Sequence, residues 1–75
     1  MRKSYNFLIE SDRAGHTLVL NSREIGTFTT LAAAEAEANN LANLAVPGAN
    51  LRFELDFMST LTDLEMRAAT LHCRA

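Results

Sequence analysis

One stretch limits what this chain can fold into more than any other: residues 29–48, TTLAAAEAEANNLANLAVPG. Its apolar residues recur at the three- and four-residue spacing of one helical face, with polar residues opposite them. The apolar stripe consists of Leu31, Ala34, Ala38, Leu41, Ala42 and Ala45. Thr29 or Thr30 can cap the first turn, and Pro47-Gly48 ends the helix. Because the stripe is mostly alanine, the helix can lie close to its neighbour, which favours packing on a flat sheet.

Three short segments before this helix have the composition of strands. Residues 4–10 alternate between an apolar face and a more polar one, which is the period of a half-buried strand. Residues 17–20 and 24–28 follow, each after a turn, and both contain β-branched or aliphatic residues. The first third of the chain therefore predicts a three-stranded antiparallel meander.

Two more elements follow the helix. Residues 51–57 alternate most cleanly, with Leu51, Phe53, Leu55 and Phe57 predicted to point inward. In the tail, Thr62 and Glu65 have the spacing of a capping box. An apolar stripe continues from that point and predicts a second helix ending near His72. The stripe consists of Leu61, Leu64, Ala68 and Leu71.

These elements predict an α+β fold of the order β-β-β-α-β-α, as a single domain over residues 1–75. A strand, helix, strand crossover makes its two strands parallel, so the fourth strand can pair with the first. We therefore expect a four-stranded, mostly antiparallel sheet of order 3-2-1-4, with both helices on one face. The predicted core is Phe7, Ile9, Leu41, Phe53 and Leu55.

Composition restricts the chemistry. Seven basic and nine acidic residues give a formal net charge of −2, which argues against direct binding of nucleic acid. Cys73 is the only cysteine, so no disulfide can form within the chain, and we expect a reducing, cytoplasmic setting. The apolar run near the N-terminus is too short for a signal peptide or a membrane span. Two histidines and one cysteine make no usual zinc set, and no cofactor is expected.

No residue set predicts catalysis. His72 and Cys73 are neighbours in the predicted second helix, where their side chains would point about 100° apart. His72 can instead cover part of the apolar stripe. Glu54 and Asp56 share a strand face and resemble paired carboxylates, but a solvated strand face explains them as well. We therefore expect a protein that is not an enzyme.

The sheet face opposite the helices is the candidate site. If strands one and four are neighbours, carboxylates from both surround two apolar side chains on that face. The predicted partner-binding residues are Glu10, Asp12, Glu54, Asp56, Leu8 and Val19. Acidic groups around an apolar centre suit a protein partner with a basic surface. An ordinary solvated sheet face remains the alternative interpretation.

The segment IGTFTTLAAAEAEANNLA and its flanks, within residues 4 to 58, resemble small bacterial and phage domains of β-β-β-α-β order. The short acidic chain is also similar to phage-encoded anti-CRISPR proteins. That resemblance implies an inhibitor in a bacterial host cell that binds a CRISPR-Cas effector subunit and blocks DNA recognition as a DNA mimic. The alternative function is a small structural or adaptor module that self-associates through Leu8 and Val19. Both a monomer and a homodimer remain open.

Overall fold

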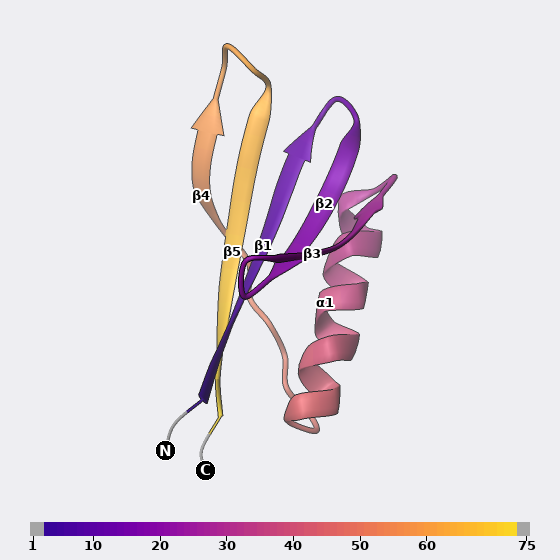
Figure 1. Cartoon of the computed structure of the whole chain (residues 1–75), viewed down its shortest axis with the longest axis vertical. Coiled ribbons are helices and arrows are strands. Elements are labelled where there is room, and N and C mark those ends of the chain that lie inside the picture. Colours follow the sequence, from indigo (N-terminus) through magenta and orange to yellow (C-terminus); the bar gives the residue numbers. More distant parts are fainter. Residues whose placement is uncertain (1–2, 74–75) are drawn as a thin grey trace.

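The computed structural model describes residues 3–73, and its elements follow the order β-β-β-α-β-β (Figure 1). The elements are β1 (Lys3–Asp12), β2 (Gly15–Leu20), β3 (Arg23–Phe28), α1 (Leu31–Ala45), β4 (Glu54–Ser59) and β5 (Leu64–Cys73). The five strands form one sheet of order β3-β2-β1-β5-β4 in which every neighbouring pair is antiparallel. No helix in this part of the chain has the length and apolar character that crossing a bilayer requires.

The predicted four-stranded sheet of order 3-2-1-4 with two helices is therefore wrong. β4 has the same direction as β1, as the crossover argument requires, but β5 lies between them. The chain crosses from β3 at one edge of the sheet to β4 at the other, and β5 then returns through the gap as a hairpin partner. β5 thus lies beside β1, in the position that the prediction gave to the fourth strand.

The predicted second helix is β5. It pairs with β1 from Lys3↔Cys73 to Ser11↔Glu65, and on its other side with β4. Leu64 and Ala68 lie on one face of β5 and Leu71 on the other, and this pattern imitates a helical stripe when the sequence is read alone. Residues 60–63 form the turn between β4 and β5 instead of a helical cap.

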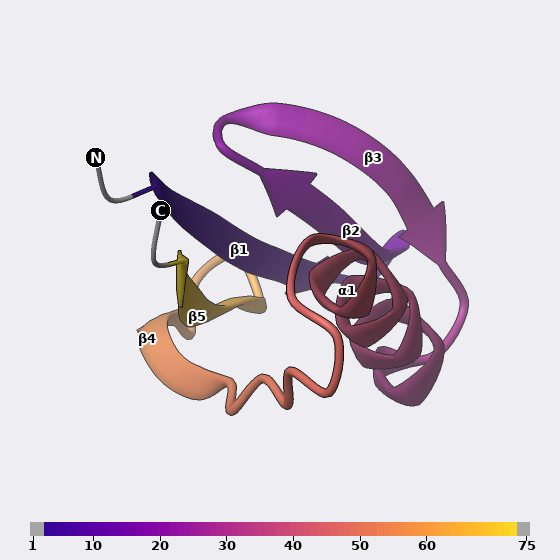
Figure 2. The ribbon, with the colours of Figure 1, turned by 90° about the horizontal axis from the view of Figure 1, so that it is seen from below.

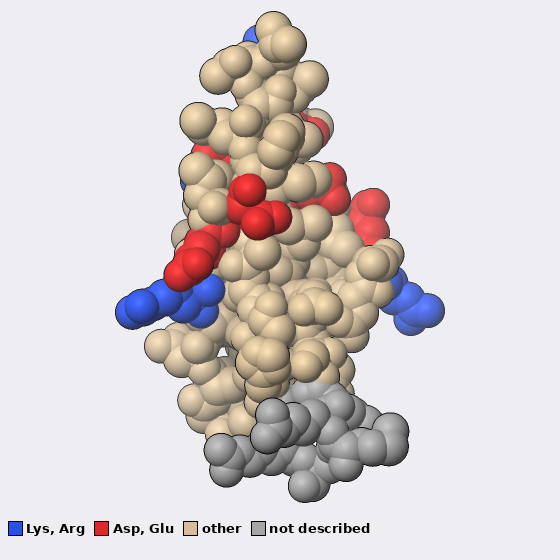
Figure 3. Space-filling view, turned by 90° about the vertical axis from the view of Figure 1, so that its left-hand side faces the viewer, with Lys and Arg blue, Asp and Glu red and all other residues tan. Residues whose placement is uncertain are grey.

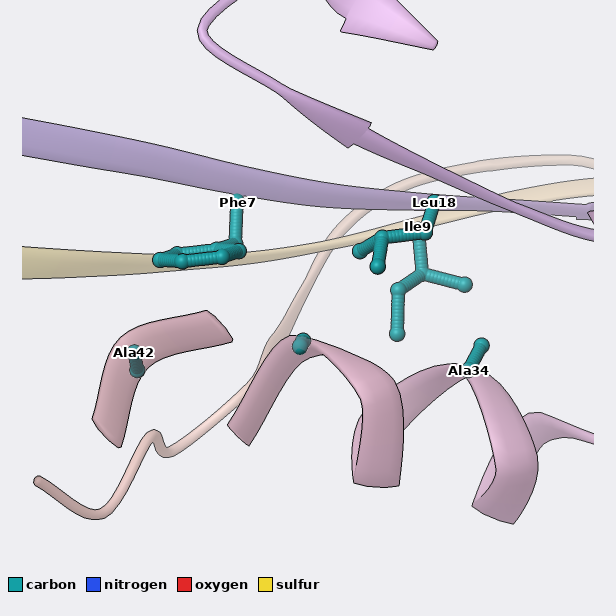
Figure 4. Packing of buried hydrophobic residues seen from close by; sticks show 6 residues of the cluster. Phe7, Ile9, Leu18, Ala34 and Ala42 are labelled. Atoms are coloured by element: carbon teal, nitrogen blue, oxygen red, sulfur yellow. The ribbon is translucent and has the colours of Figure 1, made fainter. Parts of the chain in front are cut away.

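The helix prediction is confirmed, with its cap resolved to Thr30. The Thr30 hydroxyl accepts a hydrogen bond from the backbone N–H of Ala33 at 3.1 Å, and α1 ends at Ala45, with Val46 as its C-cap. One face of α1 buries three alanines completely, and they lie against apolar side chains of β1 and β2 (Figure 4). The buried cluster consists of Ala34, Ala38, Ala42, Phe7, Ile9 and Leu18. Small side chains on α1 let it lie close to the sheet, which compensates for the few large residues in this core.

The predicted core was right in β1 and wrong in β4. Phe7 and Ile9 are buried, and Leu41 and Phe53 pack against the cluster while staying half-buried. Leu55, in contrast, is 54% exposed. The reason is the shape of the sheet, which curls around α1 so that the helix packs on β1, β2 and β3 (Figure 2). The β4–β5 end of the sheet extends beyond the helix.

The segment between α1 and β4 is held by the helix. The Asn43 amide nitrogen donates to the carbonyl oxygen of Ala49 at 2.9 Å, and its side-chain oxygen accepts from the N–H of Gly48 at 2.9 Å. Leu51 and Phe53 then pack against the core cluster from this segment. The chain therefore enters β4 from a fixed position at the end of the helix.

Candidate functional site: the outer face of the sheet

The candidate site is the face of the sheet that points away from α1. Residues opposite each other on antiparallel strands share a face, so the strand registers assign it. Leu8 lies opposite Val19 on β2 and Ala68 on β5, and Glu10 lies opposite Thr17 and Met66. On β4, Glu54 lies opposite Ala68, and Phe57 lies opposite Met66. The outer face, as used below, consists of Leu8, Glu10, Thr17, Val19, Glu24, Thr27, Met66, Ala68, Glu54 and Phe57.

A β-bulge in β4 decides which side chains this strand contributes. The register shifts between Leu55 and Phe57, which leaves Asp56 as the extra residue without a direct partner on β5. An extra residue reverses the alternation of all that follow it. Phe57, predicted to point inward, therefore lies on the outer face, where it is 48% exposed.

The predicted carboxylates are brought to different places. Glu10 and Glu54 do share the outer face, but β5 separates their strands, so their backbones lie two strand spacings apart, about 10 Å. Asp56 is exposed at the bulge. Asp12 is the last residue of β1, and one of its carboxylate oxygens accepts from the turn N–H groups of Ala14 at 2.8 Å and Gly15 at 3.2 Å. Asp12 therefore has a structural role at the rim.

The apolar centre is larger than the sequence suggested. Leu8 and Val19 are direct cross-strand neighbours, as the alternation in their strands implied, and both are half-buried. Met66 and Ala68 extend this centre across β5. The signal that could have found them is the alternation Leu64, Met66, Ala68, which the helical interpretation of the tail concealed.

The charge on this face is not balanced within the sheet. Arg67 lies opposite Ile9, on the helix side, and its Nη2 is 3.0 Å from Oε2 of Glu65. Arg13 is in a turn and pairs with Asp63 at 2.8 Å. Among the described strand residues, no arginine or lysine lies on the outer face, and no salt bridge joins Glu10 or Glu54 to another described residue. Figure 3 shows acidic side chains in a band across this side of the molecule, with basic ones at its margins.

A serine and a histidine that the sequence analysis missed meet on the helix side. Ser11 Oγ lies 2.7 Å from His16 Nδ1 across the β1–β2 pair. Ser11 is only 6% exposed, so a substrate cannot reach its hydroxyl. In the described residues no hydrogen bond joins a carboxylate to His16, as a catalytic triad would require. The pair satisfies a buried hydroxyl group.

The other chemical candidates give no catalytic arrangement. His72 Nδ1 lies 3.2 Å from Ser4 Oγ in an exposed position, and the side chain of Cys73 is outside the described part of the structure. Over residues 3–73, no group of three or more metal-binding side chains comes together. A shallow cavity of ≈ 200 Å³ at the β4–β5 turn contains Asp63 and Glu65, and both carboxylates are already paired with arginines.

Comparison of the chain with protein-family models, with curated proteins and with solved structures found no match. The function therefore has to be argued from the outer face itself.

Proposed function

We propose that this protein is a non-enzymatic inhibitor of the anti-CRISPR kind, which binds a basic, nucleic-acid-binding surface of a host defence complex. The outer face is the binding surface. The observation that carries the proposal is the pair Glu10 and Glu54, which have no basic neighbour on their face and lie on either side of Met66 and Ala68.

Two forces of different range act at the outer face. Uncompensated carboxylates attract arginine and lysine side chains over about a Debye length, close to 10 Å at 0.1 M salt, and so guide the encounter. The apolar centre around Leu8 and Met66 acts only on contact and supports the bound state. A surface that binds nucleic acid presents the complementary positive charge.

The spacing of the carboxylates defines how such an inhibitor would work. DNA carries a phosphate about every 3.4 Å along each strand, whereas Glu10 and Glu54 are two strand spacings apart, about 10 Å, and are offset by a further two residues along the strands. The outer face therefore does not copy a row of phosphates. It engages a few arginines of the partner and blocks the DNA path with the rest of the domain.

Self-association through Leu8 and Val19 fits this face less well. A symmetric sheet-to-sheet dimer would bring Glu10 and Glu54 near the same carboxylates of the second copy. Like charges placed together at an interface cost several kcal/mol in total, of the order that suppresses wrong partners. The outer face therefore suits a basic partner better than a second copy.

The test is competition with DNA on purified CRISPR-Cas effectors of several subtypes. We expect the wild-type chain to displace target DNA from at least one effector, and Glu10→Lys with Glu54→Lys to weaken this about 10- to 100-fold, or roughly 1–3 kcal/mol. Glu35→Lys with Glu37→Lys changes the net charge equally but on α1, and should inhibit like the wild type.

Two results would contradict the proposal. One is a folded Glu10→Lys, Glu54→Lys variant that inhibits as strongly as the wild type. The other is a wild-type chain that displaces DNA from none of the effectors. Circular dichroism of both double variants separates loss of binding from loss of fold.

A further inference from the structure

The β4 end of the sheet exposes most of the large apolar side chains that the fold leaves in solvent. Of the six exposed large hydrophobic residues among those described, four lie between Leu55 and Leu61. Leu55 is 54% exposed, Phe57 48%, Met58 58% and Leu61 96%. Together they form an apolar strip of the order of a few hundred Å² along β4 and the turn after it, and an apolar patch of that size is often functional.

Burying this strip would add apolar contacts that the small core of this domain lacks. Among the described residues, the buried apolar ones are Phe7, Ile9, Leu18 and four alanines, which is a small core even for a domain of this size. The chain has one cysteine, so no internal disulfide supplements that core. Small domains in this position commonly gain stability by oligomerisation.

β4 is also an edge strand, with one side paired to β5 and the other side free in the sheet order. The free side presents backbone N–H and C=O groups that can pair with another strand. The bulge in β4 determines which kind of strand can pair with its free edge. Leu55 lies opposite Arg67 and Met58 lies opposite Glu65, so both point to the helix side although they are three residues apart. In a regular strand, neighbouring residues on one face are separated by a single residue, so a regular strand cannot match the spacing of Leu55 and Met58. A second copy of β4 carries the same bulge and therefore has the same spacing.

We propose that two copies of this chain associate through β4, antiparallel, about a two-fold axis between Asp56 and Phe57. The two sheets then join into one. In this register Leu55 lies opposite Met58 of the second copy, and both are on the helix side. Glu54 lies opposite Ser59, and Asp56 opposite Phe57. Leu55 of each copy thereby meets Met58 of the other.

The charges favour the same register. With the axis between Asp56 and Phe57, no carboxylate lies directly opposite another carboxylate. An axis through Asp56 would place the two Asp56 side chains opposite each other, and this is destabilising in a sheet. The two-fold axis uses the free edge of both copies, and the remaining edge strand, β3, has its own bulge beside Val19. The assembly therefore closes as a dimer instead of growing into a fibre.

This inference is independent of the proposed function, because the outer face around Leu8 and Ala68 stays accessible in the dimer. The strip is smaller than the roughly 800 Å² per partner of a standard interface. We therefore expect the dimer to dissociate at micromolar concentrations.

Sedimentation velocity on the full chain tests the association. Between about 1 μM and 1 mM, the range in which a small interface dissociates, the wild type should shift from the monomer mass to twice that mass. Leu55→Glu should remain a monomer throughout, because it places charge inside the apolar contact. Leu44→Glu, at an 82% exposed leucine of α1, should dimerise like the wild type. A wild type that stays monomeric, or a Leu55→Glu variant that still dimerises, would overturn the proposal.

Cross-linking tests the register without relying on a disruptive variant. Residues directly opposite on antiparallel strands have Cα atoms about 4.5–5.5 Å apart, within the range of a disulfide. Leu55→Cys combined with Met58→Cys, in a Cys73→Ser background, should give a disulfide-linked dimer on mild oxidation. Either substitution alone should not, because it has no thiol opposite it. Equal cross-linking by Leu55→Cys alone would show that the register is wrong.

Discussion

Asn39 on α1 accepts a hydrogen bond from the backbone N–H of Leu51 at 2.9 Å through its side-chain oxygen. Its amide nitrogen donates to the carbonyl oxygen of Glu35 at 3.0 Å, which holds the side chain in place along the helix. Leu51 lies just before β4, so this contact fixes where the chain enters the strand that carries Glu54. An asparagine that reads in the sequence as solvent-facing therefore helps to position the candidate site.

We expect Asn39→Ala to lower the free energy of unfolding by about 1–3 kcal/mol, because it leaves the half-buried N–H of Leu51 without a partner. Asn40→Ala is the matched control, since Asn40 is exposed and its side chain makes no hydrogen bond with another described residue. It should stay within about 0.5 kcal/mol of the wild type. Urea unfolding measures both, and equal losses in the two variants would contradict this account of Asn39.

The close approach of α1 to the sheet can be tested by enlarging one alanine. Ala38 is completely buried, so Ala38→Leu should force the helix away and cost about 1–3 kcal/mol or more. Ala36→Leu adds the same atoms on the exposed side of α1 and should be nearly neutral. Thermal unfolding followed by circular dichroism compares the two. Equal melting temperatures would mean that the helix does not lie where the structure places it.

Gly15 at the start of β2 should not tolerate a side chain. Its φ is +140°, and an added Cβ would lie 2.8 Å from the carbonyl oxygen of Phe28. We expect Gly15→Ala to destabilise the fold by more than the 1–2 kcal/mol that positive φ alone costs. Gly48→Ala separates the two causes, because Gly48 has φ +84° but nothing within 4 Å of an added Cβ. A Gly48→Ala variant that unfolds more easily than Gly15→Ala would contradict the clash.

The part of the fold that could be predicted from the sequence is the part determined by neighbours along the chain. The helix was found because its cap at Thr30 and its alanine stripe are local signals. The meander was found because its strands are joined by short turns. The tail was misread because Leu64, Met66 and Ala68 have good helix propensities, and only long-range pairing with β1 makes them a strand.

The candidate site likewise has features that local sequence predicts and features that depend on long-range pairing. Alternation along β1 and β2 placed Leu8, Glu10 and Val19 correctly on one face. The separation of Glu10 from Glu54 could not be predicted, since it depends on where β5 inserts. Phe57 points to the outer face because of the bulge, and the sequence of β4 gives no local signal for a bulge. Alternation therefore predicted this face of the sheet and the Leu8–Val19 part of its apolar centre, but not the width of the face or the contribution of β5.

Binding of basic side chains at the outer face can be measured by methyl NMR. We would titrate the ¹³C-methyl-labelled chain with an arginine-rich peptide and follow the methyl groups of both faces. We expect chemical-shift changes concentrated at Leu8, Met66 and Ala68 and weakened by salt, with the buried methyl groups of Leu18 unchanged. Shifts confined to the alanine methyl groups of α1, beside Glu35 and Glu37, would contradict binding at the outer face.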